Sequence, residues 1–298
     1  MSILSDPQIS GRERLLNKVL RVDPDATLNP GLASSGPGKV GLDLASELKL
    51  SLNKIKALAM TTDGSLVDYQ QIANHPLYQS YREQVKSLAD FNYAILGGND
   101  QLLAFWLNLY NSLVIDGVIQ EKVQESVTES WIGIMGFFQK TAYTINGQRF
   151  SLTDIEHGIL RRNRGFPYFP GLHFAKTDPR IKSIIPVFDP RIHFALNCAS
   201  KSCPPIGVYD SEHIQAQLDL TTRNFINNDL RFDPDNNSLS VSRIFNWYLG
   251  DFGGKKALPG FLVKYLEDSE PRRWINQNQS TLKISFHPYD WSLNKIVH

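Results

Sequence analysis

The chain has 298 residues, of which 42% are hydrophobic and 11% aromatic, so it is long enough to bury one large core or two coupled ones. Thirty-one Lys and Arg residues balance thirty Asp and Glu residues, and the net charge of +1 provides no broad field that would attract nucleic acid or an anionic membrane. The composition therefore predicts a compact globular protein with neither of these partners.

The N-terminal residues and the two cysteines indicate a cellular compartment. The opening "MSILSDPQISGRERLL" has no cationic segment followed by an apolar run of signal-peptide length, and no uncharged apolar run is long enough to span a membrane. Two cysteines are too few for the disulfide framework of a small secreted protein. We therefore expect a cytoplasmic protein whose cysteines stay reduced unless they cycle.

The N-terminal part of the chain is predicted to be helical. A short helix precedes residues 22–41, which are rich in Pro, Gly and Ser and are typical of a loop. Apolar residues at helical spacing predict covering helices over 42–58 and 76–91. We expect residues 1–94 to form a helical extension and residues 95–298 to form a core domain.

Residues 99–120 form the strongest helix candidate, apolar nearly all round and therefore predicted to be buried. Asn99 and Asp100 are its cap candidates. Asn108 and Asn111 lie on one stripe of this helix, and buried amides need partners. They either hydrogen-bond to the backbone of a neighbouring irregular segment, or they orient a catalytic histidine or line a ligand cavity.

The segment after this helix carries a hairpin signal and a second polar helix face. Asn146-Gly147 between alternating apolar residues of 142–152 predicts a tight β-hairpin. A helix is expected to follow over 154–162, with Ile155 and Ile159 directed inward. Its other face carries Asp154, His157 and Arg161 at i, i+3 and i+4 spacing.

The C-terminal half is predicted to alternate strands and helices. The apolar run 192–198 is too short for a helix and is interpreted as a strand. The other expected elements are a helix over 211–229 with Ser211 as cap, a hairpin over 230–244, a helix over 258–268 and a terminal strand segment within 282–294. Together the elements predict an α+β fold, in which an antiparallel sheet built from hairpins packs against the buried central helix and the covering helices.

Both cysteines lie in "IHFALNCASKSCPP" (192–205), which is therefore the main site candidate. Side-chain alternation in a strand would place His193 and Cys198 on opposite faces. A turn in "ASKS" would return Cys203 toward the histidine face, and the two following prolines restrict its backbone. A rigid loop beyond a strand end is a position that commonly carries function.

Three reactive roles for the cysteines compete with an inert one. In the first role, Cys203 is a nucleophile deprotonated by His193 or His157. In the second, Cys198 and Cys203 form a reversible disulfide, although their spacing is not the CxxC redox pattern. In the nucleophile hypothesis the imidazole is held by Asn108, Asn111 or Glu156. In the third role, zinc ligation, the ligands would have to converge, and strand alternation argues against that. No metal and no cofactor are therefore expected, and two inert thiols beside a core histidine remain as the fourth reading.

Substrate-binding candidates flank the cysteine segment. "DPR" occurs at 178–180 and again at 189–191, so Arg191 follows an Asp-Pro turn. Arg161, Arg180 and Arg191 either pair with carboxylates or bind a substrate carboxylate or phosphate. Tyr110 is most simply a packing aromatic and is kept with them as a substrate-binding candidate.

Four motifs, in this order, are similar to a known family: "AFWLNLYNSLVIDGVI", "SLTDIEHGILR", "DPRIHFALNCASKSCPPI" and "YDWSLN". They resemble a family of domains of unknown function that is sometimes fused to glutaredoxin-like or DEP-like modules. The resemblance covers about residues 95–230, and "SRIFNWYLGDF" extends it toward the C-terminus. It implies thiol chemistry only by association. It directs attention to Asn108, Tyr110, Asn111, Glu156, His157, Arg161, His193, Cys198 and Cys203.

The leading expectation is a cysteine-dependent hydrolase or acyltransferase that uses a thiol–imidazole pair on a small-molecule or peptide substrate. Such an enzyme would resemble papain-like hydrolases in packing a helix on an antiparallel sheet, with the thiol and the imidazole at the seam. It would differ from them because Cys203 enters from a loop and not at a helix N-terminus. The alternatives are a non-enzymatic binding or scaffold domain and a thiol–disulfide redox protein that uses Cys198 and Cys203.

Overall fold

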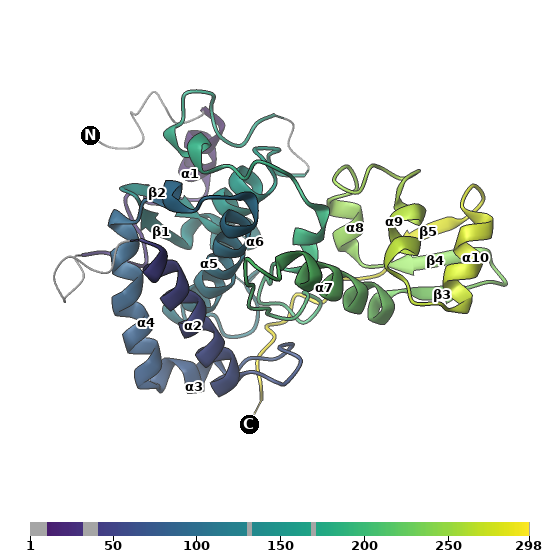
Figure 1. Cartoon of the computed structure of the whole chain (residues 1–298), viewed down its shortest axis with the longest axis horizontal. Coiled ribbons are helices and arrows are strands. Elements are labelled where there is room, and N and C mark those ends of the chain that lie inside the picture. Colours follow the sequence, from purple (N-terminus) through teal and green to yellow (C-terminus); the bar gives the residue numbers. More distant parts are fainter. Residues whose placement is uncertain (1–10, 32–40, 130–132, 168–170, 298) are drawn as a thin grey trace. The chain divides into compact units, whose positions relative to one another are not determined.

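The computed structural model describes residues 11–31, 41–129, 133–167 and 171–297 (Figure 1). The fold is α+β, as predicted, and is mostly helical with two small sheets. The chain forms two compact units. Unit 1 comprises Met1–Phe188, Leu196–Ile214 and Trp291–His298, and unit 2 comprises Asp189–Ala195 and Gln215–Asp290.

The centre of unit 1 is α5 (Asn99–Gln120), which is buried from Leu103 through Val118. Among the described residues it is the one helix long and apolar enough to cross a membrane, and most of it is buried inside the protein. Its N-cap is Gly98, which makes no side-chain cap bond, so the predicted caps are wrong. Asn99 instead accepts a hydrogen bond from the backbone N–H of Val187 at 3.1 Å.

The helices before α5 belong to the same unit. α2 (Leu42–Ala59) and α3 (Tyr69–Asn74) both pack against α5, and α4 (Pro76–Lys86) packs against α2. The predicted division at residue 94 therefore does not coincide with a boundary between units. Other helical segments of unit 1 are α1 (Gly11–Val19), η2 (Ser87–Asp90), η3 (Tyr93–Ile95), α6 (Gly133–Lys140) and η5 (Pro179–Ser183).

The predicted hairpin is confirmed as β1 (Ala142–Ile145) paired with β2 (Gln148–Ser151). Asn146 and Gly147 have φ angles of 50° and 70°, the left-handed pair that a tight two-residue turn requires. Their N–H groups donate to the carbonyls of Leu88 and Ala89, both in η2. The hairpin turn is thereby fixed against the preceding segment.

The helix expected over 154–162 is present as the π-helix η4 (Asp154–Leu160). The N–H of Arg161 donates to the carbonyl of Glu156 at 2.8 Å, which is the five-residue spacing of a π-helix. All seven residues of η4 are buried, so Ile155 and Ile159 lie inward as predicted, and Asp154 and His157 of the polar face are buried as well. Gly158 allows this close packing, because a Cβ there would lie 2.2 Å from a ring carbon of Phe174.

Unit 2 contains the second sheet, with β3 (Arg231–Asp233), β4 (Ser238–Val241) and β5 (Lys283–Phe286) in that order. β3 and β4 are the predicted antiparallel hairpin, whereas β4 and β5 run parallel. The expectation of one antiparallel sheet is therefore wrong in detail, since the strands form two separate sheets and one is mixed. Leu239 and Val241 point into the core, and Ser238 and Ser240 point away from it.

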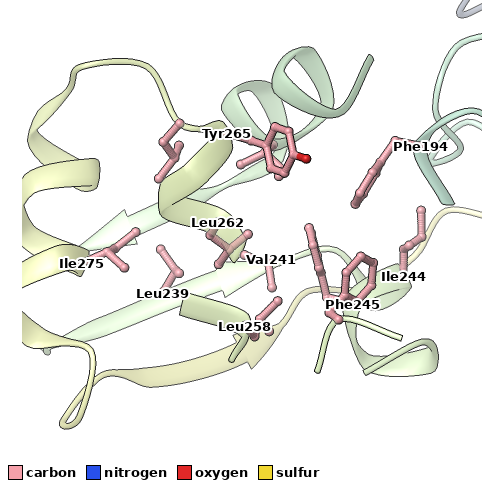
Figure 2. Close-up of a cluster of buried hydrophobic side chains, with 12 residues drawn as sticks. Phe194, Leu239, Val241, Ile244, Phe245, Leu258, Leu262, Tyr265 and Ile275 are labelled. Carbon is pink, nitrogen blue, oxygen red and sulfur yellow. The ribbon is translucent and has the colours of Figure 1, made fainter. Parts of the chain in front are cut away.

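Four helices accompany this sheet. They are α7 (Ile214–Asp229), α8 (Arg243–Trp247), α9 (Leu258–Tyr265) and α10 (Glu270–Asn278). α7 begins three residues after Ser211, so Ser211 is not its cap. The cluster that fills unit 2 combines aliphatic side chains with aromatic rings, among them Phe194 and Phe245 at a centroid distance of 5.4 Å (Figure 2). Leu258 and Leu262 of α9 complete it from the helical side.

The strand predicted over 192–198 is wrong. Residues Pro190–Phe194 form the short 3₁₀ helix η6, and the chain is irregular beyond it. Asp189 caps η6 by accepting from the N–H of Arg191 at 2.9 Å, and Pro190 occupies its first turn. The alternation of faces inferred for His193 and Cys198 consequently does not apply.

Candidate functional site

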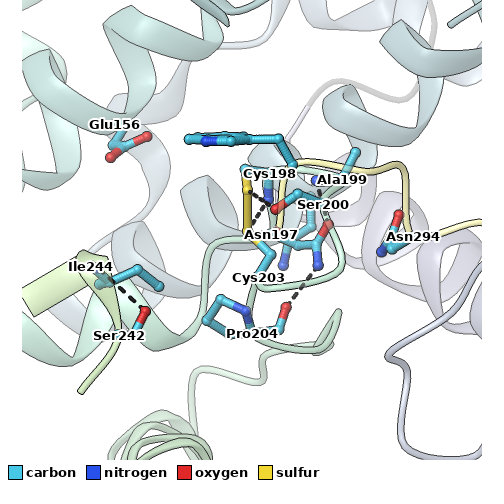
Figure 3. Close-up of a disulfide and its surroundings, with 12 residues drawn as sticks. Glu156, Asn197, Cys198, Ala199, Ser200, Cys203, Pro204, Ser242, Ile244 and Asn294 are labelled. Atoms are coloured by element: carbon cyan, nitrogen blue, oxygen red, sulfur yellow. Dashed lines mark hydrogen bonds between the residues drawn. A yellow bond between two sulfur atoms is a disulfide. The ribbon is translucent and has the colours of Figure 1, made fainter. Parts of the chain in front are cut away.

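The candidate site is the segment 197–210 of unit 1, called the cysteine loop below (Figure 3). Cys198 and Cys203 form a disulfide across it, with their Cα atoms 6.0 Å apart. The N–H of Cys198 donates to Cys203 Sγ at 2.7 Å, and the N–H of Cys203 donates to the carbonyl of Ser200 at 3.1 Å. Both cysteines are half-buried, so solvent reaches the pair.

Asn197 connects the two ends of the disulfide-closed turn. Its side-chain Nδ2 donates to the carbonyl of Pro204 at 2.7 Å, and Figure 3 shows this bond beside the sulfurs. Its Oδ1 accepts from the N–H of Ala199 at 2.8 Å. Because Asn197 precedes Cys198 and Pro204 follows Cys203, the amide forms a second bridge beside the disulfide.

Two asparagines of α5 form hydrogen bonds to the backbone of the cysteine loop. Asn108 pairs with the backbone of Tyr209 through both side-chain atoms, donating at 2.7 Å and accepting at 2.8 Å. Asn111 accepts from the N–H of Asn197 at 3.0 Å and donates to the carbonyl of Gly207 at 3.4 Å. This is the first of the two predicted roles, in which the buried amides bind the backbone of an irregular segment.

The C-terminal segment lies along the other edge of the loop. The N–H of Lys201 donates to the carbonyl of Ser292 at 2.9 Å, and the N–H of Asn294 donates to the carbonyl of Ala199 at 3.1 Å. These bonds flank an isolated β-bridge between Ser200 and Leu293. The loop is therefore held along its outer edge as well as from α5.

A third attachment involves the turn after α2. The N–H of Ile206 donates to the carbonyl of Gly64 at 3.0 Å, and Lys56 Nζ donates to the carbonyl of Ile206 at 2.7 Å. Burial lowers the pKa of Lys56. Gly64 has a φ of 75°, and a Cβ there would lie 2.7 Å from the Ile206 oxygen, so glycine is required at this approach.

His157 and Glu156 lie on η4 and have partners of their own. Arg161 Nη1 lies 3.1 Å from His157 Nδ1, and because a guanidinium can only donate, His157 Nδ1 is the acceptor of this hydrogen bond. Arg161 also donates to the carbonyl of Gly165. Tyr110 donates to Glu156 Oε2 at 3.1 Å. His157 Nδ1 is therefore already engaged by Arg161.

The other predicted base, His193, lies in unit 2, whereas Cys203 lies in unit 1. His193 Nε2 is 2.9 Å from Asp251 Oδ2, and its ring stacks on Tyr248 at a centroid distance of 3.9 Å. Cys203 Sγ accepts from the N–H of Cys198 and is bonded to Cys198 Sγ, so in this state there is no Cys203 thiol for an imidazole to deprotonate.

The predicted anion-binding arginine of unit 2 is occupied by carboxylates. Arg191 donates to Asp189, to Asp219 at 2.7 Å and to the side chain of Gln215. All of these partners belong to unit 2. The arrangement agrees with the ion-pair role given as one of the two alternatives for Arg191.

A buried charge cluster in unit 1 gives Arg180 the ion-pair role that was one of its two alternatives, but the sequence did not reveal most of its partners. Arg180 lies 2.7 Å from both Glu13 Oε2 and Asp178 Oδ2, and 3.3 Å from Asp154 Oδ2. His173 Nε2 lies 2.7 Å from Asp154 Oδ1. Burial alone would raise the pKa of Asp154, but Arg180 and His173 bring it below its usual value. Most of these partners come from separate segments of the chain, so no local sequence pattern predicts that they meet.

Unit 2 holds a further polar chain that the sequence did not reveal. His287 Nε2 lies 2.9 Å from Asp229 Oδ1, and its Nδ1 lies 3.4 Å from the hydroxyl of Ser240. Burial raises the pKa of Asp229. Asp229 also accepts from the N–H of Ser242 at 2.7 Å, so the carboxylate ties the end of α7 to the sheet.

Metal ligation by the cysteines is incompatible with the oxidised pair, because both sulfurs are bonded to each other. Another group, formed by the half-buried Asp210 and the exposed Glu212 and His213, has ligand atoms within 4.8 Å of one another. Lys49 forms an ion pair with Asp210, so this group already has a cationic partner.

Comparison with known proteins supports the family resemblance. Residues 94–226 match a family model described as a protein of unknown function, DUF547. The matched segment includes α5, η4 and the whole cysteine loop. No curated protein and no solved structure matches the chain.

Proposed function

We propose that Cys198 and Cys203 form a reversible thiol–disulfide redox site. The observation that carries this proposal is the geometry of the pair: the only two cysteines of the chain are bonded to each other, half-exposed, and held in a loop that is anchored independently of the sulfurs. Asn108 and Asn111 supply that anchorage from α5. Exchange requires a thiolate to reach a disulfide sulfur, and half-exposed sulfurs permit this.

The reaction transfers two electrons and two protons. A thiolate of an external dithiol attacks Cys198 Sγ, the bond to Cys203 Sγ breaks, and Cys203 leaves as a thiolate that then takes a proton from water. The second thiol of the reductant attacks the mixed disulfide and releases Cys198, so the reductant becomes a disulfide. The N–H of Cys198, 2.7 Å from Cys203 Sγ, favours a negative charge on that sulfur.

This reaction needs fewer rearrangements than the hydrolase hypothesis. A thiol hydrolase needs a free thiol with an imidazole within hydrogen-bonding reach. Here Cys203 is oxidised, and His157 receives a hydrogen bond from Arg161. Hydrolase or acyltransferase activity would first require reduction of the pair.

A redox titration tests the proposal. The protein is equilibrated without oxygen in mixtures of reduced and oxidised dithiothreitol, quenched with acid and alkylated, and the modified cysteines are counted by intact mass. We expect both cysteines to change together at one midpoint, with the circular dichroism spectrum unchanged. Cys198→Ser and Cys203→Ser variants serve as controls, since each leaves one thiol that titrates with no partner.

Two results would favour the alternatives. If the pair stays oxidised at every ratio, or if reduction unfolds the protein, the disulfide is structural and the scaffold hypothesis is favoured. If the reduced protein is alkylated much faster at Cys203 than at Cys198, and His157→Gln removes that difference, the thiol–imidazole hypothesis is favoured instead.

We also propose a cytoplasmic location, where dithiol reductants that could return the pair to thiols are present. Fractionation of cells that produce the protein tests this location. Recovery of the protein only from an oxidising compartment would contradict it.

A further inference from the structure

We propose that Asn197 holds the two cysteines at disulfide distance after reduction, so that the physiological reductant of this site carries two thiols and not one. This inference rests on the proposed redox function. It assigns Asn197 as a positioning residue and specifies the chemical class of the redox partner.

The hydrogen bonds of Asn197 do not depend on the disulfide. Its backbone N–H donates to Asn111 Oδ1 at 3.0 Å, and its side chain joins Ala199 to Pro204 through bonds of 2.8 and 2.7 Å. None of these bonds involves a sulfur atom. Asn197 is only 1% exposed, so water competes poorly for its amide. The bonds therefore persist when the Sγ–Sγ bond is broken.

The bridge from Asn197 to Pro204 lies directly beside the sulfurs. Asn197 and Pro204 are the residues immediately outside Cys198 and Cys203, and their bond fixes the separation of the two flanking backbone segments. Ala199, inside the turn, has a φ of 61° and is held there by the same side chain. A left-handed backbone at alanine is unfavourable unless its surroundings impose it.

Fixed separation makes the pair reclose efficiently. After a monothiol attacks Cys198 Sγ, the thiolate of Cys203 stays close to the mixed disulfide. It attacks Cys198 Sγ again, expels the monothiol and restores the original bond, with no net transfer of electrons. Groups held near each other react as if at a very high concentration, so a second monothiol molecule rarely intervenes.

A dithiol escapes this limit. Once one of its thiols is bonded to Cys198, its second thiol is also intramolecular and competes with Cys203 on equal terms. Its attack on the reductant's own sulfur releases Cys198 as a thiol and leaves the reductant as a closed disulfide. The loop therefore discriminates between reductants by thiol number, not through a binding pocket.

Glutathione and dithiothreitol, a monothiol and a dithiol, provide the test. Each is equilibrated with its own disulfide form and with the native full-length protein, and the fractions of dithiol, disulfide and mixed disulfide are measured by acid quenching and intact mass. For the unmodified protein we expect dithiothreitol to reduce the pair while glutathione at the same thiol concentration leaves it oxidised. Equal reduction by the two reagents would overturn the inference.

The variant Asn197→Ala removes the second bridge. We expect its equilibrium constant for closure against glutathione to fall by about tenfold, the change that loss of one or two net hydrogen bonds produces, and the mixed disulfide to accumulate. Asn197→Asp keeps the size and the acceptor for Ala199 but loses the donor to Pro204, and should give the same direction of change if Asn197→Ala fails to fold.

Asn29→Ala is the matched control. Asn29 is also buried in unit 1 and bridges backbone groups, accepting from the N–H of Thr144 and donating to the carbonyls of Val85 and Thr144. Its loss should destabilise the fold without changing the closure constant. If Asn197→Ala behaves as Asn29→Ala does while the unmodified pair still cycles with dithiothreitol, the role of Asn197 is wrong and the redox function stands. If dithiothreitol does not reduce the unmodified pair, the redox function itself fails.

Discussion

The cysteine loop of unit 1 and the core of unit 2 are held together by different interactions. In unit 1, the cysteine loop is held by buried amides, chiefly those of Asn108, Asn111 and Asn197. In unit 2, the core is an apolar cluster of aliphatic and aromatic side chains in which the rings of Phe194 and Phe245 are in contact. Apolar packing tolerates substitutions that conserve volume, whereas a hydrogen-bonded network fixes individual atoms. The sulfur pair, whose reaction depends on the distance between two atoms, lies in a loop that is held by such a network.

The largest expected effect tests the polar side of this comparison. Arg180→Met leaves the buried carboxylates of Glu13, Asp154 and Asp178 without their shared cation. We expect the free energy of unfolding to fall by about 3–5 kcal/mol, measured by urea denaturation. The control is Arg273→Met, which removes an exposed ion pair with Asp268 and should cost no more than about 1 kcal/mol. Similar small losses for both variants would show that the buried cluster does not stabilise unit 1.

A comparable effect is expected on the apolar side. Phe245→Ala removes a ring that is 0% exposed at the centre of the unit 2 cluster, and should cost about 3–5 kcal/mol. Phe245→Leu keeps most of the volume and should cost less than half as much. Hydrogen exchange of the amides of β4 and α9 measures the loss in unit 2 itself. Equal protection in both variants and the unmodified protein would contradict a packing role for this ring.

A smaller effect is expected where an amide of α5 holds the cysteine loop. Asn108→Ala leaves the N–H and the carbonyl of Tyr209 buried without their partner, and should cost about 1–3 kcal/mol in urea denaturation. Asn74→Ala is the matched control, because Asn74 also donates to a backbone carbonyl, that of Gln70, but at an exposed position. If the two variants lose the same free energy of unfolding, the buried amide of Asn108 does not stabilise the loop as the comparison requires.

The smallest effect is a dependence of stability on pH. Although burial opposes it, Arg180 and His173 lower the pKa of Asp154, so the folded protein resists protonation that the unfolded chain accepts near pH 4. The stabilisation from Asp154 is therefore present above about pH 4 and is lost as the pH falls below it. Burial raises the pKa of the neighbouring Glu13, which acts in the opposite direction.

Asp154→Asn should accordingly reduce the slope of stability against pH between about pH 4 and pH 2, measured from the urea midpoint at each pH. A variant with the same acid slope as the unmodified protein would show that Asp154 does not carry this dependence. Asp235→Asn, at an exposed position, is the control and should leave the slope unchanged.

Local sequence signals predicted much of the fold. The helices predicted over 42–58 and 99–120 correspond almost residue for residue to α2 and α5. The turn predicted at Asn146-Gly147 connects β1 and β2. These signals are local, because periodicity and turn preference act within one segment. The strand predicted over 192–198 failed, since its apolar residues are buried by tertiary packing and not by pairing with another strand.

The site was predictable only in part. The cysteines and the stripe of Asn108 and Asn111 could be identified from residue type and spacing, and the disulfide was one of the stated alternatives. Asn197 was assigned no role, although it directly precedes Cys198, because its partner Pro204 is set by the shape of the turn. The clusters around Arg180 and His287 draw residues from distant segments, and only the folded chain brings them together.

The redox state of Cys198 and Cys203 inside living cells tests the central claim most directly. Cells that produce the protein are quenched in acid before, during and after a brief oxidant pulse, and the two cysteines are alkylated and weighed. The account predicts that the fraction of the disulfide form rises during the pulse and returns to its starting value afterwards. A pair that remains entirely disulfide or entirely thiol throughout would contradict it.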